Sequence, residues 1–482
     1  GGRVLHMLRK ELGEATFWAA LKTYAERHAR GSVETRDLAR AIESISGRNL
    51  DGFFAQWIGR PGHPEIEAAW RWDDDRQVGT VRLEQKSTGD PFAFPLVVQF
   101  EVDPDAADED ARFVTERLNV SERIHNFDVS LTARPTQVLL DPGDVLLKSL
   151  KFDKPVALWA RQLEAAPLGI DRLLAAKALA SMPTPEAERA LGRALIRDRF
   201  WAVRGAAAQA LGKIRSTQAR AFLDAGRADD HPKVRRAVAN ALGEFVADPV
   251  AGRLLAEWAK RGDASVFVEA ATALALGRSR AANAVDVLSG MLDRDAYQDV
   301  IRSRALEGLG ASADERALPI LEAAFVPEAS FQVRRAALNG ITILCEGTPH
   351  ARRARELLER GLDDRDFRVR MEAAAGLATL GDSRSVPALE RAARAELDGR
   401  AKRRLREAVT DINEHGTTSE QTRKLSEEVE QLRRELFELR QRVTKVEHPI
   451  PATTGSKRSE PGAPRRPRPP SRRGAKTGRR RR

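Results

Sequence analysis

The chain of 482 residues contains one cysteine, Cys345, and therefore no internal disulfide. Cys345 closes the apolar run from Ile341, which indicates a buried structural thiol. No apolar stretch approaches the roughly 18 residues that a membrane helix needs. The eight histidines include no pair four residues apart, the spacing at which one helix presents two imidazoles to a zinc ion. We therefore predict no catalytic, cofactor-binding or metal-ligating residue in this chain.

The excess of positive charge is confined to one end of the chain. The formal net charge is +11, and residues 449–482 hold twelve Lys and Arg against one acid, Glu460, so the other 448 residues are neutral overall. The segment is rich in Pro, Gly and Ser and has almost nothing apolar to bury. We expect residues 448–482 to form a disordered Arg- and Pro-rich tail that binds nucleic acid non-specifically by neutralising phosphates. The competing explanation is that Arg outnumbers Lys throughout the chain.

The first residues follow a helical pattern. Val4, Leu5 and Leu8 share one face, and we expect this apolar face to need a further domain to cover it. The sequence starts at Gly1 in the middle of this helical pattern and without an initiator Met, so we expect the natural N-terminus to lie further upstream. A breaker that contains Pro61 ends the helical segment.

A period of two replaces the helical period in the next segment. Apolar residues alternate in several short runs, and turn clusters rich in Asp, Gly and Pro separate the runs. We predict a small β-sandwich over residues 63–152. The alternating runs are Ile66 to Trp72, Val81 to Leu83, Leu96 to Val102, Phe127 to Leu131 and Val138 to Leu140.

A repeat follows over residues 166–415. Its core reads Val-Arg-x-x-Ala-Ala-x-Ala-Leu-Gly, in which the apolar positions recur at helical spacing and the glycine suits a helix C-terminus. Each helix pair is too small to bury its own face, so the units should stack as a HEAT-like α-solenoid. The repeats begin at Val203, Val234, Val266, Ile301, Val333 and Val369, and a weaker unit begins at Asp171.

The arginine of the repeat recurs as a column at Arg204, Arg235, Arg302, Arg334 and Arg370. One hypothesis is that these guanidinium groups grip carboxylates or phosphates of a ligand. The favoured hypothesis is an Arg–Asp ladder that ties adjacent units together, because an aspartate precedes several of the repeat cores by three to five residues. These aspartates are Asp198, Asp230, Asp263 and Asp366.

Residues 418–447 carry a strict heptad seam. Apolar residues from Leu425 to Val446 are spaced alternately by four and three, with mixed charges between them. We predict a short coiled coil and self-association through residues 425–446. The alternative is a helix folded back on the solenoid, which would call for a wider apolar stripe.

The opening segments together resemble a known family. The residues from Gly1 to Arg9, from Thr35 to Leu50 and from Phe53 to Pro64 resemble the gluzincin zinc aminopeptidases, the membrane alanyl aminopeptidase-like metallopeptidases. The resemblance implies that residues 1–62 are the last helices of a thermolysin-like catalytic domain and that Gly1 is the glycine of a Tyr-x-Lys-Gly element. It also implies that zinc and the His-Glu-x-x-His helix belong to the full-length protein, upstream of this chain.

Two functions follow from these features. The first is that the chain is a C-terminal fragment of a zinc-dependent aminopeptidase that removes N-terminal residues from peptides, with the solenoid as a peptide-holding or protein-interaction scaffold. The alternative is a non-catalytic HEAT-repeat scaffold that oligomerises through its coiled coil and binds nucleic acid through its tail. Both make the fold mainly α with a small β domain, both make this chain inactive alone, and neither assigns a compartment.

The heptad seam generates a test. Changing Leu432 and Leu436 to Asp places charge in the predicted seam, and we expect light scattering to find a smaller particle than for the unchanged chain. With only about three heptads, the association should be weak by itself. An unchanged mass would favour the folded-back alternative.

Overall fold

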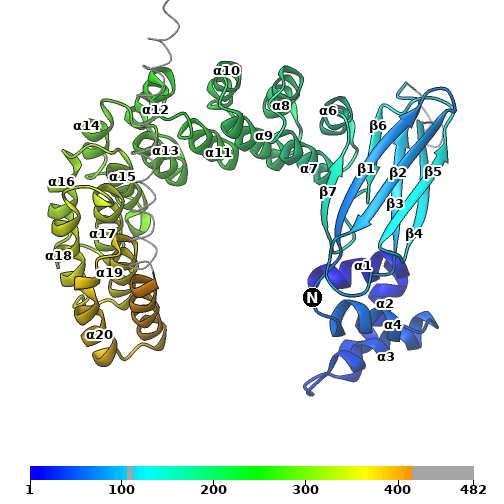
Figure 1. Ribbon diagram of the computed structural model, residues 1–482, viewed down its shortest axis with the longest axis horizontal. Coiled ribbons are helices and arrows are strands. Elements are labelled where there is room, and N and C mark those ends of the chain that lie inside the picture. Colours follow the sequence, from blue (N-terminus) through cyan, green and yellow to red (C-terminus); the bar gives the residue numbers. More distant parts are fainter. Residues whose placement is uncertain (106–111, 415–482) are drawn as a thin grey trace, which may run out of the picture. The chain divides into compact units, whose positions relative to one another are not determined.

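The computed structural model of the protein describes residues 1–105 and 112–414. Within these ranges the chain is mainly helical with a small β region: helices open it, strands follow, and a long series of helix pairs completes it (Figure 1). The predicted coiled coil at 418–447 and the tail at 448–482 lie outside the described residues.

The opening helices build a small core of their own. Leu8, Ala20, Ile42 and Leu50 pack together, while Val4 and Met7 join the larger core of the neighbouring sheets. The expectation that Val4 and Leu8 need a further domain to cover them was wrong, because they are only 4% and 0% exposed in this chain. The helices are α1 (Gly2–Leu12), α2 (Glu14–Arg27), α3 (Thr35–Ser46), α4 (Asp51–Phe54) and the π-helical turn η1 (Ala55–Gly59).

The strands form two sheets, a four-stranded sheet of order β5-β2-β1-β7 and a three-stranded sheet of order β4-β3-β6. All pairs are antiparallel except β1 with β7, which returns the chain to the first strand in parallel. Alternate residues such as Val81, Leu83, Val98 and Phe100 fill the core. The strands are β1 (Glu65–Asp73), β2 (Val78–Gln85), β3 (Phe94–Glu101), β4 (Phe113–Val120), β5 (Ile124–Ser130), β6 (Gln137–Leu140) and β7 (Ser149–Asp153).

The remaining helices lie in two rows. Helices α7, α9, α11, α13, α15, α17 and α19, here called the B helices, pack each against the next, and the A helices between them in sequence cover one side of this row (Figure 1). An unlabelled helix at residues 399–414 follows. The bounds are α6 (Val156–Ala165), α7 (Gly169–Leu179), α8 (Pro185–Arg197), α9 (Trp201–Ile214), α10 (Thr217–Gly226), α11 (Pro232–Leu242), α12 (Pro249–Arg261), α13 (Val266–Arg278), α14 (Ala284–Ser289), η2 (Tyr297–Asp299), α15 (Val300–Ala311), α16 (Ala317–Ala324), α17 (Phe331–Cys345), α18 (Ala351–Gly361), α19 (Phe367–Leu380), η3 (Ser383–Ser385) and α20 (Val386–Ala395).

One repeat was predicted in the wrong register. The valine that starts the third core is Val268, which is fully buried like Val203 and Val234, rather than the partly exposed Val266. The two-residue slip arose because both valines fit an apolar position, while the residue after Val268 is Glu269 where the other repeats carry arginine.

The glycines of the repeat serve packing rather than helix termination. Gly212 and Gly310 lie inside α9 and α15, and Gly243 at the end of α11 has φ −64°, a value that any residue adopts. A Cβ atom on Gly310 would lie 2.4 Å from the Cα of Gly340, and one on Gly277 would lie 2.0 Å from the carbonyl oxygen of Gly308. Neighbouring B helices therefore touch backbone to backbone at these positions.

This contact predicts the effect of a single methyl group. Gly277→Ala should force α13 and α15 apart and cost about 1–3 kcal/mol of stability, because the added atom meets backbone that has nowhere to move. Gly399→Ala is the matched control, since nothing lies within 4 Å of its added Cβ. Thermal melting followed by circular dichroism measures both, and equal midpoints for the two variants would contradict the packing role of Gly277.

Candidate functional site

The histidines serve local structure. The His63 Nε2 atom lies 2.9 Å from the Ser149 hydroxyl, at the join between the opening helices and β7. His125 accepts hydrogen bonds from the backbone N–H groups of its own turn. His231 stacks on Trp201 with ring centroids 4.8 Å apart. Across residues 1–105 and 112–414, no group of three or more His, Cys, Asp or Glu is placed to hold a metal ion.

Cys345 is a buried thiol at the end of α17, as the sequence predicted. Burial raises the pKa of this thiol to about 11, and the negative charge of Glu322 adds to the rise. Because the thiolate is the nucleophilic form, Cys345 is unreactive at neutral pH. It belongs to the core rather than to a catalytic site.

The arginine column forms the predicted ladder. Every arginine of the column except Arg302 spans from its own B helix to a carboxylate in the loop that leads into the next repeat, with two parallel hydrogen bonds, and Arg172 of the weaker unit does the same. The bonds use the planar fork of arginine, which matches a carboxylate in geometry. The rungs, with their shortest N–O distances, are Arg172–Asp198 at 2.7 Å, Arg204–Asp229 at 2.6 Å, Arg235–Asp263 at 2.7 Å, Arg334–Asp364 at 2.7 Å and Arg370–Glu396 at 2.6 Å.

Two of the predicted partners were wrong by one or two residues. The carboxylates of Asp229 and Asp364 accept from the ladder arginines Arg204 and Arg334, whereas the carboxylates of Asp230 and Asp366 pair with no arginine of the ladder. The correct aspartate also accepts a hydrogen bond from the N–H group two residues later, so the same carboxylate closes the turn before the next helix. Spacing alone did not distinguish adjacent aspartates in these loops. The weakest repeat in sequence, at Arg172, nevertheless carries a complete rung.

Each arginine also binds its own loop. Arg204 donates to the backbone carbonyl of Asp198 at 2.9 Å, and Arg235 donates to that of Asp229 at 2.8 Å. Since Asp198 and Asp229 are themselves rung carboxylates, the rungs join into a continuous chain along the loops. The hydrogen bond to Asp229 raises the pKa of Arg204, and the bond to Asp263 raises that of Arg235. These guanidinium groups are occupied, so the ladder hypothesis is confirmed and the ligand-gripping hypothesis fails for the complete rungs.

The Arg–Asp rungs of the ladder are replaced by other contacts between α13 and α17. At the third repeat the charges are exchanged, and Glu269 on the helix binds Arg294 in the loop at 2.7 Å. Arg302, predicted as a member of the column, instead binds the carbonyl of Leu292 and the side chain of Asp299. Asp299 in turn accepts from the Ser330 hydroxyl at 2.6 Å, which ties this loop to the start of α17.

Buried polar groups fuse the sheets to the first solenoid helices. Glu101 on β3 is fully buried and accepts from Arg161 of α6 at 2.7 Å. Burial acts to raise the pKa of Glu101, but hydrogen bonds from Arg161, Arg112 and Thr136 outweigh it and lower the pKa. Lys154 donates to the carbonyl of Val138 at 2.6 Å, and burial depresses its pKa well below the usual value.

The opening helices are seated on the sheets in a similar way. The Gln56 side chain exchanges two hydrogen bonds with the backbone of Ala93, at 2.8 and 2.9 Å. Trp57 stacks on Phe92 with centroids 5.7 Å apart, and the Arg60 guanidinium lies 3.8 Å above the same ring. These contacts hold the end of the helical segment against the strands.

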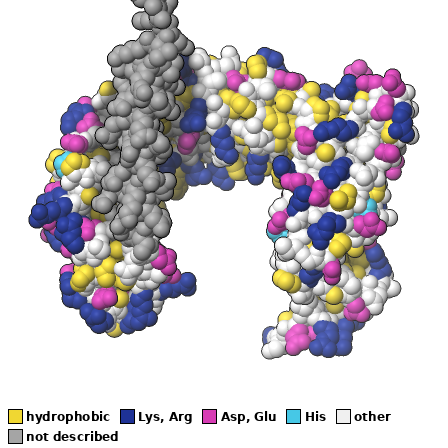
Figure 2. Space-filling model, in the orientation of Figure 1, with side chains coloured by type: hydrophobic (Ala, Val, Ile, Leu, Met, Phe, Trp, Pro, Cys, Tyr) yellow, Lys and Arg dark blue, Asp and Glu magenta, His cyan; other side chains and the backbone are white. Residues whose placement is uncertain are grey.

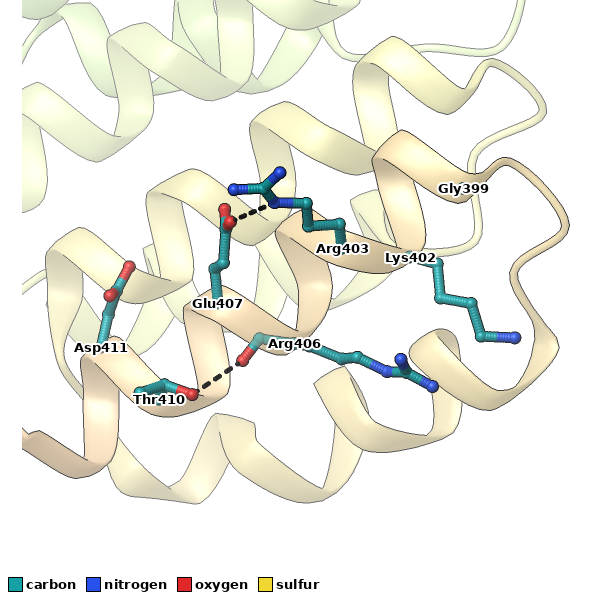
Figure 3. A pocket seen from close by; sticks show the side chains of 7 residues that line it. All are labelled: Gly399, Lys402, Arg403, Arg406, Glu407, Thr410 and Asp411. Carbon is teal, nitrogen blue, oxygen red and sulfur yellow. Dashed lines mark hydrogen bonds and ion pairs between the residues drawn. The ribbon is translucent and has the colours of Figure 1, made fainter. Parts of the chain in front are cut away.

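A shallow pocket of about 360 Å³ lies along the helix of residues 399–414 (Figure 3). Arg403 binds Glu407 at 2.7 Å, and the Thr410 hydroxyl donates to the backbone carbonyl of Arg406. Lys402 and Arg406 extend from the same helix (Figure 3). The lining of this pocket holds neither a histidine nor a cysteine, and its charged side chains resemble those of an ordinary exposed helix.

Comparison with protein families divides the chain in two. Residues 1–57 match the Peptidase family M1 domain. The repeats match HEAT repeats at residues 156–243, 196–275, 225–309 and 325–410, and residues 301–326 match the PBS lyase HEAT-like repeat. The chain therefore carries an M1 aminopeptidase-like segment followed by HEAT repeats.

Individual relatives agree with this division. Aminopeptidase N of Lactococcus lactis subsp. lactis is 38% identical over 68 residues, which is 14% of this chain and 8% of that protein. Aminopeptidase N of Streptomyces lividans is 27% identical over 167 residues, 32% of this chain and 19% of that protein. The chain thus aligns with less than a fifth of the length of these enzymes.

A solved structure extends the likeness to the fold. The crystal structure of Legionella pneumophila aminopeptidase A in complex with aspartic acid superposes with a TM-score of 0.55 at 11% identity. The superposition covers 85% of this chain and 56% of that chain. Among the described residues, no helix is both long and apolar enough to cross a membrane.

The ladder predicts a large effect for one buried rung. Arg334 is 2% exposed and binds Asp364, so Arg334→Ala leaves a buried carboxylate without its partner and should cost about 3–5 kcal/mol. Arg352→Ala is the control, because its exposed pair with Glu356 should contribute below about 1 kcal/mol. Urea unfolding followed by circular dichroism measures both variants. Equal midpoints would contradict a structural role for the rung.

Proposed function

Because an M1 aminopeptidase-like segment leads into HEAT repeats, we propose that this chain is the C-terminal part of a zinc-dependent aminopeptidase that removes N-terminal residues from peptides. The match of residues 1–57 to the Peptidase family M1 domain is the observation that carries the proposal. Residues 1–105 and 112–414 hold no group of three or more His, Cys, Asp or Glu placed to bind a metal ion, and in this proposal the zinc and its general base come from another part of the protein. In this proposal, the chain contributes support and a holding surface.

The contacts between the three parts support a role in positioning. Glu11 of α1 binds Arg117 of β4 at 3.2 Å, and Arg3 binds Asp144 beside the sheets. Glu101 and Arg161 then connect the sheets to α6. A chain of charged contacts thus runs from the aminopeptidase-like helices to the repeats. In this proposal, these contacts join a peptide-holding surface on the repeats to the helices that end the catalytic domain.

The opening segment carries exposed large apolar side chains, and we expect the rest of the catalytic domain to lie against them. Trp18 is 54% exposed, and Val33, Ile45 and Ile58 are each more than 40% exposed. Large apolar side chains left in water favour contact with another protein surface. These side chains take the role expected of Val4 and Leu8, which the chain covers itself.

Hydrolysis assays test the proposal. This chain alone, supplied with zinc and aminoacyl anilides, should show no turnover, because activating a water molecule needs the metal and its general base. The complete gene product should hydrolyse the same anilides, lose activity with a zinc chelator and recover it with zinc.

Two outcomes would contradict the proposal. Chelator-sensitive turnover by this chain alone would place the catalytic groups within residues 1–482. A complete gene product that binds no zinc and cleaves no anilide would favour the alternative, a non-catalytic scaffold that oligomerises and binds nucleic acid.

A further inference from the structure

We propose that the free face of the B helices α7 to α13 binds an acidic, extended polypeptide segment. The face is defined by Lys177, Lys213, Lys233, Arg236 and Arg278, and we call it the basic B-row face. The proposal rests on the scaffold role proposed above and specifies the chemistry of what the solenoid holds.

The repeat places these side chains on one side of the row. Positions are counted from the first residue of each repeat core. Lys233 lies one position before Val234, Lys177 lies six positions after Asp171, and Lys213 lies ten positions after Val203. At 100° per residue these positions fall within about 40° of one another on a helix. The first position of the core is buried, and a Cβ atom built on Gly205 would lie 3.8 Å from the Cβ of Ala237 on the next B helix. The remaining side is open to solvent.

The five cations of this face are exposed and form no ion pair with any residue in the described ranges. Lys233 has one neighbour of note, the Trp201 ring, whose centroid lies 4.5 Å from its Nζ atom. Figure 2 shows Lys and Arg side chains gathered along the edge beneath α9 and α11. Neither α9 nor α11 contains an acidic residue, but the exposed Glu244, two residues beyond the end of α11, holds the position in its repeat that Lys213 holds in α9, so one acid lies within the face.

The second half of the row differs in charge. On α15, α17 and α19 the exposed arginines are each neutralised by an acid of the same surface. The cations of the first half therefore remain available to a ligand, while those of the second half do not. The neutralised pairs are Arg304–Glu307, Arg335–Glu372 and Arg368–Asp366.

Amide and apolar side chains on the same face favour a polypeptide over a nucleic acid. Gln209 and Asn240 occupy equivalent positions of neighbouring repeats, are exposed, and form no side-chain hydrogen bond with described residues. A side-chain amide both donates and accepts, which suits a peptide backbone. Phe267, 56% exposed, and the half-buried Leu274 add apolar contact on α13.

The repeat spacing suggests the spacing of the acids. Packed helices lie about 8–10 Å apart, and an extended chain advances about 3.3 Å per residue. One acid in every third residue would then meet one repeat after another. A suitable probe is a fluorescein-labelled peptide of four Glu-Gly-Ser units, with four Gln-Gly-Ser units as the neutral probe and a twelve-nucleotide oligothymidylate as the nucleic-acid probe.

The experiment compares two triple variants of the full chain. The first is Lys177→Glu, Lys233→Glu and Arg236→Glu on the basic B-row face. The matched control is Arg189→Glu, Arg253→Glu and Lys260→Glu, which makes the same change of charge on the A helices α8 and α12. Both variants keep the basic residues 449–482, so binding by that segment is common to them. Equal melting temperatures establish that both are folded.

We expect the first variant to bind the acidic peptide about tenfold more weakly than the control at low salt, because three favourable charge contacts become unfavourable. The difference should shrink at about 0.5 M salt and be absent for the neutral probe. Equal affinity of the two variants for the acidic peptide would overturn the proposal. So would a loss confined to the oligothymidylate, which would assign the face to nucleic acid. Neither result depends on hydrolysis, so the aminopeptidase proposal stands or fails separately.

Discussion

The backbone contact between neighbouring B helices is the constraint on which the solenoid depends. A stacked repeat has no central core, and each unit is stable only through the surfaces it shares with the next. At Gly277 and Gly310 those surfaces meet with no room for a side chain. The small residues set how close the helices come, and closeness sets whether an arginine can reach the loop of the next repeat. The Arg–Asp ladder is thus a consequence of the packing as well as a support for it.

The ladder explains why the repeats tolerate variation in some places and not in others. The exchange of charges at Glu269 and Arg294 keeps the ion pair while reversing its direction, so the geometry of the rung matters more than which side carries the cation. At Arg302 the rung is replaced by contacts inside one loop, and Ser330 takes over the connection to the next helix. The solenoid stays continuous because Gly308 and Gly310 still hold α15 against its neighbours.

The sequence predicted the larger features of the fold because they repeat. Six cores and one weak unit were visible from the recurring small and apolar residues, although the third core was placed two residues too early, and alternation marked β1 and β3. Strand β4 was missed because only Leu118 and Val120 on it are buried, so it lacks the alternation of a half-buried strand. Strand β7 was missed because it is short and pairs with β1, far away in sequence. The choice of Asp229 over Asp230 depended on side-chain direction in a loop, which spacing does not encode.

The sequence predicts the function less well than the fold, because function depends on which charged side chains remain unpaired in the structure. The charges that the structure leaves free are found only by subtracting those that pair with one another, and some of the pairs join residues far apart in sequence, such as Arg204 with Asp229 and Arg335 with Glu372, 25 and 37 positions apart. In sequence Arg236 and Arg335 are equivalent, each following a ladder arginine. In the structure Arg335 is neutralised by Glu372 and Arg236 is not. The surface on which a partner can act is therefore a property of the stacked repeats, and the same composition in a different register would leave a different face charged.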